Sequence, residues 1–173
     1  MKTFLMTAFG KDRPGIVADV TEVIYETGCN LEDTSMTRLA EEFTLVLLFT
    51  GKGDDLETRL IKECRRLEIE KNLSAFVRQV EIQDVPLVTA DKLQTIKVVG
   101  LDQSGIVYKI SKFLAENKIN IEKLVSRRIP SAESGAALYH MVLEVLTPGG
   151  EPIQDYAEGL EDIAGELHVD ILF

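Results

Sequence analysis

An internal repeat is the feature of this sequence that most constrains its fold. Residues 10–32 and 100–122 align without a gap at a constant offset of 90, and eight of the 23 positions are identical. The identical pairs are Gly10/Gly100, Asp12/Asp102, Gly15/Gly105, Ile16/Ile106, Val17/Val107, Glu26/Glu116, Asn30/Asn120 and Glu32/Glu122. Self-similarity of this kind indicates a duplicated structural unit, so we expect two copies of one module.

The segment between the copies supplies a natural boundary, because it contains Pro86, the only proline between them. We therefore predict a first module over 1–84, a linker over 85–91 and a second module over 92–173. The net charge of −10 is shared evenly, with 11 basic and 16 acidic side chains up to residue 86 and 8 and 13 after it.

Each copy shows the same order of strand and helix patterns. Segments rich in β-branched and apolar residues predict strands over 3–9, 31–38, 43–50 and 76–82 in the first copy, and over 95–99, 121–129, 138–146 and 168–173 in the second. Apolar residues at helical spacing predict two helices per copy, around Ile16–Ile24 and Leu56–Leu67, and around Ile106–Leu114 and Tyr156–Leu167. This order predicts an α+β fold of two ferredoxin-like βαββαβ modules, each with an antiparallel sheet and helices on one face.

Local signals refine this prediction. Pro14 favours the first turn of the first helix, and Gly28 suits the position just past its end. The polar hairpin connection over 130–136 is longer than its counterpart at 40–42.

The charge and the residue inventory disfavour several classes of function. A net charge of −10 argues against direct nucleic-acid binding, which needs a basic face. The sequence has only two histidines, His140 and His168, so it offers few candidates for a metal ligand or a histidine base. Cys29 and Cys64 form no CxxC motif. We predict no catalytic residue, no metal and no cofactor.

The sequence also predicts a soluble, cytoplasmic protein without membrane contact. No apolar run approaches the ~18 residues that a membrane helix needs. The N-terminal residues continue into Asp12 and Pro14, where a signal peptide would have a small-residue cleavage site.

The loop over 10–16 and the two repeated asparagines allow two interpretations each. The glycines and the following helix start could hold a carboxylate or phosphate against free N–H groups, or could simply form a strand-to-helix turn. Asn30 and Asn120 offer the donors and the acceptor that an amino acid requires, or could be turn residues.

The string Asp12-Arg13-Pro14-Gly15-Ile16-Val17, followed by Gly28-Cys29-Asn30-Leu31, resembles the signature of ACT domains, the small regulatory modules of amino-acid metabolism. Residues 100–107, with Asn120-Ile121, are similar. The tandem pair looks most like the glycine cleavage system transcriptional repressor group. The resemblance implies βαββαβ modules that pair their sheets and bind an amino acid at the module interface.

In that family the contacts come from the first loop and from the residue that starts the second strand. Carried over, the ligand-binding residues are Asp12, Gly15, Ile16, Asn30, Asp102, Gly105, Ile106 and Asn120. The second copy departs from the pattern, with Gln103 and Ser104 in place of Arg13 and Pro14, so it is the weaker candidate site.

The leading hypothesis is a non-catalytic regulatory protein that binds a small amino acid resembling glycine or serine. It would act through a protein partner, including in transcriptional regulation of glycine cleavage, and would form a homodimer. One alternative is an interaction scaffold without a ligand. The other is a regulatory fragment related to formyltetrahydrofolate deformylase, whose start is similar but which continues into a formyl-transfer domain rather than a second copy of the module.

Overall fold

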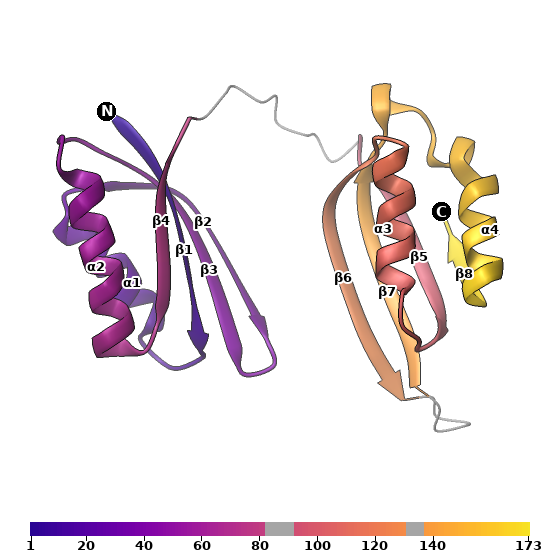
Figure 1. The fold of residues 1–173 in the computed structure, drawn as a ribbon, viewed down its shortest axis with the longest axis horizontal. Helices are drawn as coiled ribbons and strands as arrows, with labels where there is room; N and C mark the ends of the chain where they lie inside the picture. The colour runs from indigo at the N-terminus through magenta and orange to yellow at the C-terminus, as the bar shows by residue number, and fades with distance from the viewer. Residues whose placement is uncertain (82–91, 131–136) are drawn as a thin grey trace. The chain divides into compact units, whose positions relative to one another are not determined.

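The computed structural model describes residues 1–81, 92–130 and 137–173, which form two compact units, Met1–Val85 and Pro86–Phe173 (Figure 1). We call these units module 1 and module 2. The linker predicted over 85–91 lies outside the described residues, as does nearly all of the hairpin connection predicted over 130–136. The exact module boundaries therefore stay predictions.

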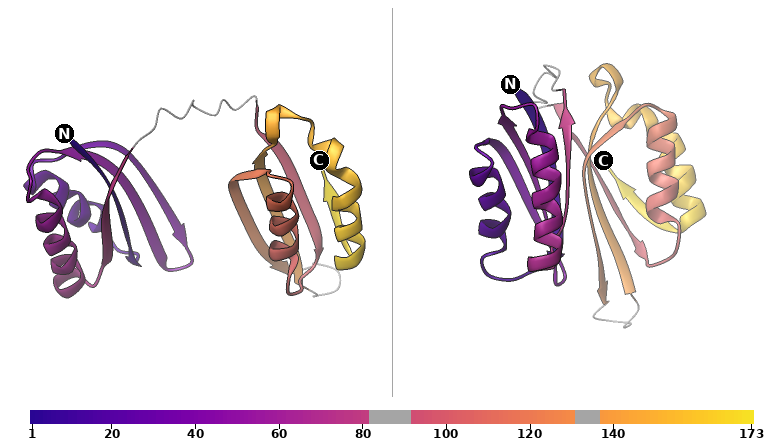
Figure 2. Two further views of the ribbon diagram at one scale, coloured as in Figure 1. Left: turned by 45° about the horizontal axis from the view of Figure 1, so that its top comes forward. Right: turned by 60° about the vertical axis from the view of Figure 1, so that its left-hand side comes forward.

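Module 1 contains six elements in the predicted order. They are β1 (Lys2–Lys11), α1 (Ile16–Glu26), β2 (Asn30–Leu39), β3 (Glu42–Gly51), α2 (Leu56–Lys71) and β4 (Ser74–Val80). The strands form one antiparallel sheet in the order β2-β3-β1-β4, and both helices cover one of its faces (Figure 2).

Module 2 repeats this plan, which confirms the predicted fold class. Its main elements are β5 (Gln94–Leu101), α3 (Ile106–Glu116), β6 (Asn120–Pro130), β7 (Ala137–Leu146), α4 (Ala157–Leu167) and β8 (Val169–Leu172), in a sheet of order β6-β7-β5-β8. Two short 3₁₀ turns, η2 (Pro148–Gly150) and η3 (Ile153–Tyr156), precede α4. Helix α4 has 11 residues and α2 has 16, and the turn η3 takes the place of the first part of the longer helix.

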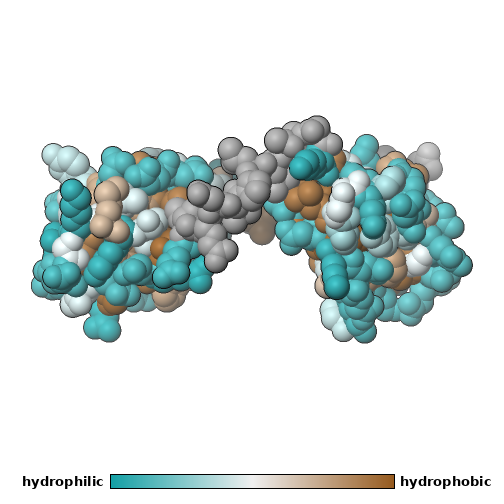
Figure 3. All heavy atoms as spheres, turned by 90° about the horizontal axis from the view of Figure 1, so that it is seen from above, coloured by the Kyte–Doolittle hydropathy of each residue, from teal (hydrophilic) through white to brown (hydrophobic). Residues whose placement is uncertain are grey.

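Each module has its own hydrophobic core between its sheet and its helices. Alternate residues of the strands point to this layer, as Phe4, Met6 and Ala8 of β1 do, while the helices contribute their apolar stripes. The core of module 2 contains Ile96, Val98, Ile110, Leu114, Met141, Leu143, Val145 and Leu160. The view in Figure 3 shows a mostly hydrophilic surface over the described parts of both modules. None of the helices in the described residues is long and apolar enough to cross a membrane.

The repeated glycines of the central strands are explained by packing. A Cβ on Gly10 would lie 2.9 Å from Leu73 Cδ2, and one on Gly100 would lie 2.5 Å from Val169 Cγ1. Leu73 and Val169 both come directly after a residue in the left-handed conformation at the end of the second helix. The close approach of a second chain segment therefore disfavours a side chain at both positions, and more strongly at Gly100, where a Cβ would also lie 3.0 Å from Val169 Cα.

The constant offset of 90 ends at the hairpin. Gly10 pairs with Phe43 and Gly100 with Tyr139, so the offset between the modules is 96 from there on. The prediction that Pro14 lies in the first turn of the helix was wrong, because Pro14 lies two residues before the first helical residue. Gly15 is the N-cap of α1 with a φ of +85°, so the helix begins only at Ile16 and Pro14 lies in the preceding turn.

Candidate functional site

The loop between β1 and α1, residues 12–15, exposes an uncapped helix start. Gly15 adopts a φ of +85°, and no side chain in the described residues caps the first turn of α1. The N–H of Ile16 donates to Arg13 O at 3.4 Å, and that of Asp19 donates to Gly15 O at 3.0 Å. The N–H groups between them, of Val17 and Ala18, have no acceptor within the described chain. A helix start of this kind attracts negative charge.

The space beside this helix start is open. A Cβ built on Gly15 would meet no atom of the described residues within 4 Å. The same holds for Gly105, which has a φ of +96° and precedes α3 without a side-chain cap. A side chain at either position would therefore be disfavoured by backbone conformation rather than by crowding.

The two repeated aspartates tie their loops to the neighbouring hairpin. The Asp12 N–H donates to Glu41 O at 2.7 Å, and Arg38 Nη1 lies 3.4 Å from Asp12 Oδ2. In module 2 the Asp102 N–H donates to Ala137 O at 2.9 Å, and Arg128 Nε lies 3.0 Å from Asp102 Oδ2. Both carboxylates remain about one-third exposed. Each can therefore hold the loop in place and still face a cation.

The repeated isoleucines belong to the cores. Ile16 and Ile106 are each only 2% exposed and pack in their module's hydrophobic cluster. Their side chains cannot reach a ligand in the loop, so only their backbone could contribute to a site.

The repeated asparagines lie at the other end of the sheet from the loop. Asn30 pairs with Thr50, which pairs with Thr3 near the start of β1, whereas Asp12 follows the end of β1. Nine residues of extended chain from Thr3 to Asp12 separate Asn30 from the start of the loop by roughly 25–30 Å along the sheet. One small ligand therefore cannot contact both residues within one module.

Each asparagine instead binds a nearby glutamate. Asn30 Nδ2 donates to Glu32 Oε1 at 3.0 Å, and Thr50 Oγ1 donates to the same atom at 2.8 Å. These two hydrogen bonds lower the pKa of Glu32 from its usual value of 4.5. In module 2 Asn120 Nδ2 donates to Glu122 Oε1. Local hydrogen bonding thus accounts for the repetition of the asparagines and glutamates together.

A charged cluster that the sequence analysis missed fixes the loop of module 1. Arg13 Nη2 lies 2.6 Å from Asp19 Oδ2, and Lys71 Nζ lies 3.0 Å from Asp19 Oδ1. These hydrogen bonds, to Arg13 first and then to Lys71, lower the pKa of Asp19 from its usual value of 3.8. The signal in the sequence is an aspartate in the first turn of a helix, close to an arginine in the preceding loop, but its partner Lys71 is far away in the chain.

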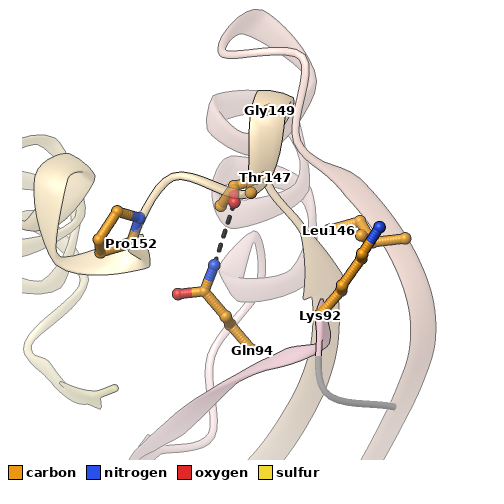
Figure 4. A pocket seen from close by; sticks show the side chains of 7 residues that line it. Lys92, Gln94, Leu146, Thr147, Gly149 and Pro152 are labelled. Carbon is orange, nitrogen blue, oxygen red and sulfur yellow. Dashed lines mark hydrogen bonds between the residues drawn. The ribbon is translucent and has the colours of Figure 1, made fainter. Parts of the chain in front are cut away.

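The sequence analysis also missed a cavity of about 690 Å³ in module 2. Lys92, Gln94, Thr147, Gly149 and Pro152 are among the residues that line it (Figure 4). Gln94 Nε2 donates to Thr147 Oγ1 at 3.0 Å and to Glu151 O at 2.7 Å, while its Oε1 accepts from the Ile153 N–H at 2.6 Å. The amide is therefore fully used in holding the η2 and η3 turns, and none of the predicted site residues lines this cavity.

The described residues contain no cluster of His, Cys, Asp and Glu side chains that could hold a metal ion. Burial raises the pKa of the Cys64 thiol to about 11, as expected for a core cysteine that does not react.

Comparison with known proteins agrees with this architecture. An ACT domain family model matches residues 2–78, all within module 1. Over 165 residues the chain is 27% identical to the glycine cleavage system transcriptional repressor of Escherichia coli K12. The aligned residues make up 95% of this chain and 85% of the repressor. A UPF0237 protein of Methanopyrus kandleri is 36% identical over 83 residues, which cover 47% of this chain and 92% of that relative.

Solved structures support the fold. A protein of unknown function from Galdieria sulphuraria has a TM-score of 0.73 and 24% identity, over 99% of this chain and 96% of its own. A candidate glycine cleavage system transcriptional repressor has a TM-score of 0.71 and 22% identity, over 99% of this chain and 95% of its own. With the repeated βαββαβ order and the family match, the chain belongs to the ACT domain family as a tandem ACT-domain protein that resembles the glycine cleavage system transcriptional repressor group.

Proposed function

We propose that this chain is a non-catalytic regulatory protein that binds a small amino acid, resembling glycine or serine, at the β1–α1 loop of module 1. The observation that carries the proposal is the uncapped start of α1 beside Gly15, where the N–H groups of Val17 and Ala18 have no acceptor in the described chain. These groups and the helix dipole suit a carboxylate.

The same loop offers a partner for the other end of an amino acid. The carboxylate of Asp12 is 29% exposed and suits an ammonium group. The Asp12 carboxylate can accept hydrogen bonds from an ammonium group, and the free N–H groups can donate to a carboxylate. The loop therefore matches a zwitterion better than a simple anion. Open space around Gly15 leaves room for a ligand beside these groups.

Asn30 and Asn120 cannot contact a ligand at the loop of their own module, because each lies at the far end of the sheet from that loop. We propose a symmetric homodimer. A two-fold axis that reverses the strand direction brings the asparagine end of one copy beside the loop end of its partner, where the amide can hydrogen-bond the ligand.

The signal would pass to a protein partner. Ligand binding would favour one arrangement of the modules, and the partner would distinguish the arrangements. A net charge of −10 disfavours direct contact with DNA, so a role in repressing glycine cleavage genes would run through another regulatory protein.

A thermal-shift panel with each of the twenty amino acids at millimolar concentration tests the proposal. We expect glycine or serine to raise the melting temperature, since a ligand that binds only the folded state stabilises it. Asn30→Ala should weaken binding by about five- to 150-fold, the effect of leaving one polar group unpaired.

Two glycine variants separate binding from stability. Gly15→Ala should remove the ligand response. The matched control, Gly53→Ala, also places a side chain at positive φ, here +127°, but in the connection between β3 and α2. It should keep the response. A wild-type chain that responds to none of the twenty amino acids would refute the sensor, and the ligand-free interaction scaffold would then be the better account.

A further inference from the structure

The candidate loop is joined to the second helix of its module in both modules, but by different chemistry. In module 1, Asp19 accepts hydrogen bonds from Arg13, in the loop, and from Lys71, the last residue of α2. The side chain of Asp19 is only 16% exposed. One partly buried carboxylate thus connects the loop, the first turn of α1 and the end of α2.

Module 2 makes the same connection without a charged side chain at the position of Arg13. Gln103, which corresponds to Arg13, donates from Nε2 to the carbonyl oxygen of Leu167, the last residue of α4. Lys109 corresponds to Asp19 and pairs with Glu166, so the charges between the two helices are reversed. The substitutions in the second copy therefore replace the anchor of the loop rather than remove it.

The other attachments of the two loops are alike, which isolates this difference. Both loops are held to a hairpin by an aspartate N–H and by an aspartate–arginine pair. Both have a left-handed glycine at the helix start. An ion pair weakens as salt shortens the Debye length, whereas a hydrogen bond between an amide and a carbonyl carries no net charge to screen.

We propose that Asp19 is a positioning residue that latches the β1–α1 loop of module 1 to the end of α2, and that this ionic latch makes the loop of module 1 more sensitive to salt than the loop of module 2. The latch itself is independent of any ligand. Its consequence for binding rests on the proposed function, because loosening the loop would misplace the N–H groups at the start of α1.

Hydrogen exchange of the full chain without ligand tests the latch. Peptides covering 12–19 and 102–109 are compared at about 0.02 M and about 1 M NaCl, where the Debye length falls to roughly 3 Å. We expect exchange at 12–19 to rise about fivefold with salt, the size of effect that a partly exposed ion pair gives. Exchange at 102–109 should rise by less than exchange at 12–19, because there salt screens only the Asp102–Arg128 and Lys109–Glu166 pairs and not the anchor of the loop to α4.

Variants assign the effect to Asp19. Asp19→Asn should give fast exchange at 12–19 at both salt concentrations, and the conservative Asp19→Glu should restore part of the salt dependence. Glu63→Gln is the matched control. It removes the ion pair of Glu63 with Arg66, both in α2, whose Oε2 and Nε atoms lie 2.6 Å apart and which does not touch the loop. It should leave exchange at 12–19 unchanged.

Equal salt dependence in the two loops, or unchanged exchange at 12–19 in Asp19→Asn, would overturn the latch. A peptide from the buried strand β3, over 43–49, reports whether Asp19→Asn unfolds the module. If it does, Arg13→Gln decides instead: the latch predicts that the salt dependence of exchange at 12–19 falls to that at 102–109, and an unchanged salt dependence contradicts it. None of these readings needs a ligand, so a chain that binds no amino acid would refute the proposed function and leave the latch standing.

Discussion

Modules 1 and 2 share the backbone of the helix-start loop and differ in the side chains that anchor it. Gly15 and Gly105 have similar positive φ values, and the aspartate three residues earlier makes the same two contacts in each module. The anchor to the second helix is Arg13 with Asp19 and Lys71 in one module and Gln103 with a carbonyl oxygen in the other.

This comparison shows which repeated residues are explained by the requirements of the fold. Gly10 and Gly100 are repeated because a neighbouring segment crowds the place that a Cβ would take, and Ile16 and Ile106 because they fill the core. Gly15 is repeated because its φ of +85° favours glycine, and the space beside it is open. This helix start is where our proposal places the ligand.

The largest expected difference between the modules comes from alanine at the repeated strand glycine. In Gly100→Ala the new Cβ would lie 3.0 Å from Val169 Cα, so backbone must move, and we expect a loss of about 1–3 kcal/mol in module 2. In Gly10→Ala the nearest atom is the end of the flexible Leu73 side chain, so module 1 should lose about 1 kcal/mol or less.

Hydrogen exchange of the buried strands β3 and β7 measures these losses separately in the two modules. An equal loss in both modules would contradict the packing explanation, because the two glycines face different atoms.

The next effect should be the same in both modules. Gly15→Ala and Gly105→Ala each place a side chain at positive φ without a clash, so each should cost its module about 1–2 kcal/mol. The same exchange measurement applies. A loss in only one module would mean that the two helix starts are not equivalent in backbone strain.

Much of the fold follows from local patterns, but the site does not. Alternation in β3 and the apolar stripe of α2 are visible in the sequence, so the βαββαβ order is predictable. The charge cluster of Asp19 depends on Lys71, 52 residues away, which no local pattern connects to it. The separation of Asn30 from Gly15 likewise follows from strand pairing, which brings β2 into register with β3 rather than with the loop.

A smaller effect concerns acid sensitivity in module 1. Hydrogen bonds from Asn30 and Thr50 lower the pKa of Glu32. The ionised carboxylate therefore stabilises the module fully when the pH is above 4.5, the usual pKa, and this contribution is lost as the pH falls through the lowered pKa. Asn30→Ala should raise the pKa of Glu32 toward 4.5 and make the module less sensitive to acid in this range. Carboxyl NMR titration measures the shift. An unchanged Glu32 pKa would show that the hydrogen bond is absent in solution.

The smallest effect uses the fact that both cysteines lie in module 1. Cys64 is 5% exposed and its thiol pKa is about 11, so its thiolate is scarce at pH 8, whereas Cys29 is half-buried. We expect a maleimide to label Cys29 first and Cys64 only when module 1 opens. Mass spectrometry of the labelled peptides distinguishes them. Faster labelling of Cys64 would contradict its place in the core.

Calorimetric titration with glycine and with serine tests the central claim, that the loop of module 1 binds a small amino acid. Wild type should give a saturable heat, Gly15→Val should abolish it, and Gly105→Val should retain it. The β-branched side chain at positive φ strains both variants alike, so only the position of the ligand distinguishes them. Loss of the heat in Gly105→Val but not in Gly15→Val, or no heat in wild type, would contradict the account.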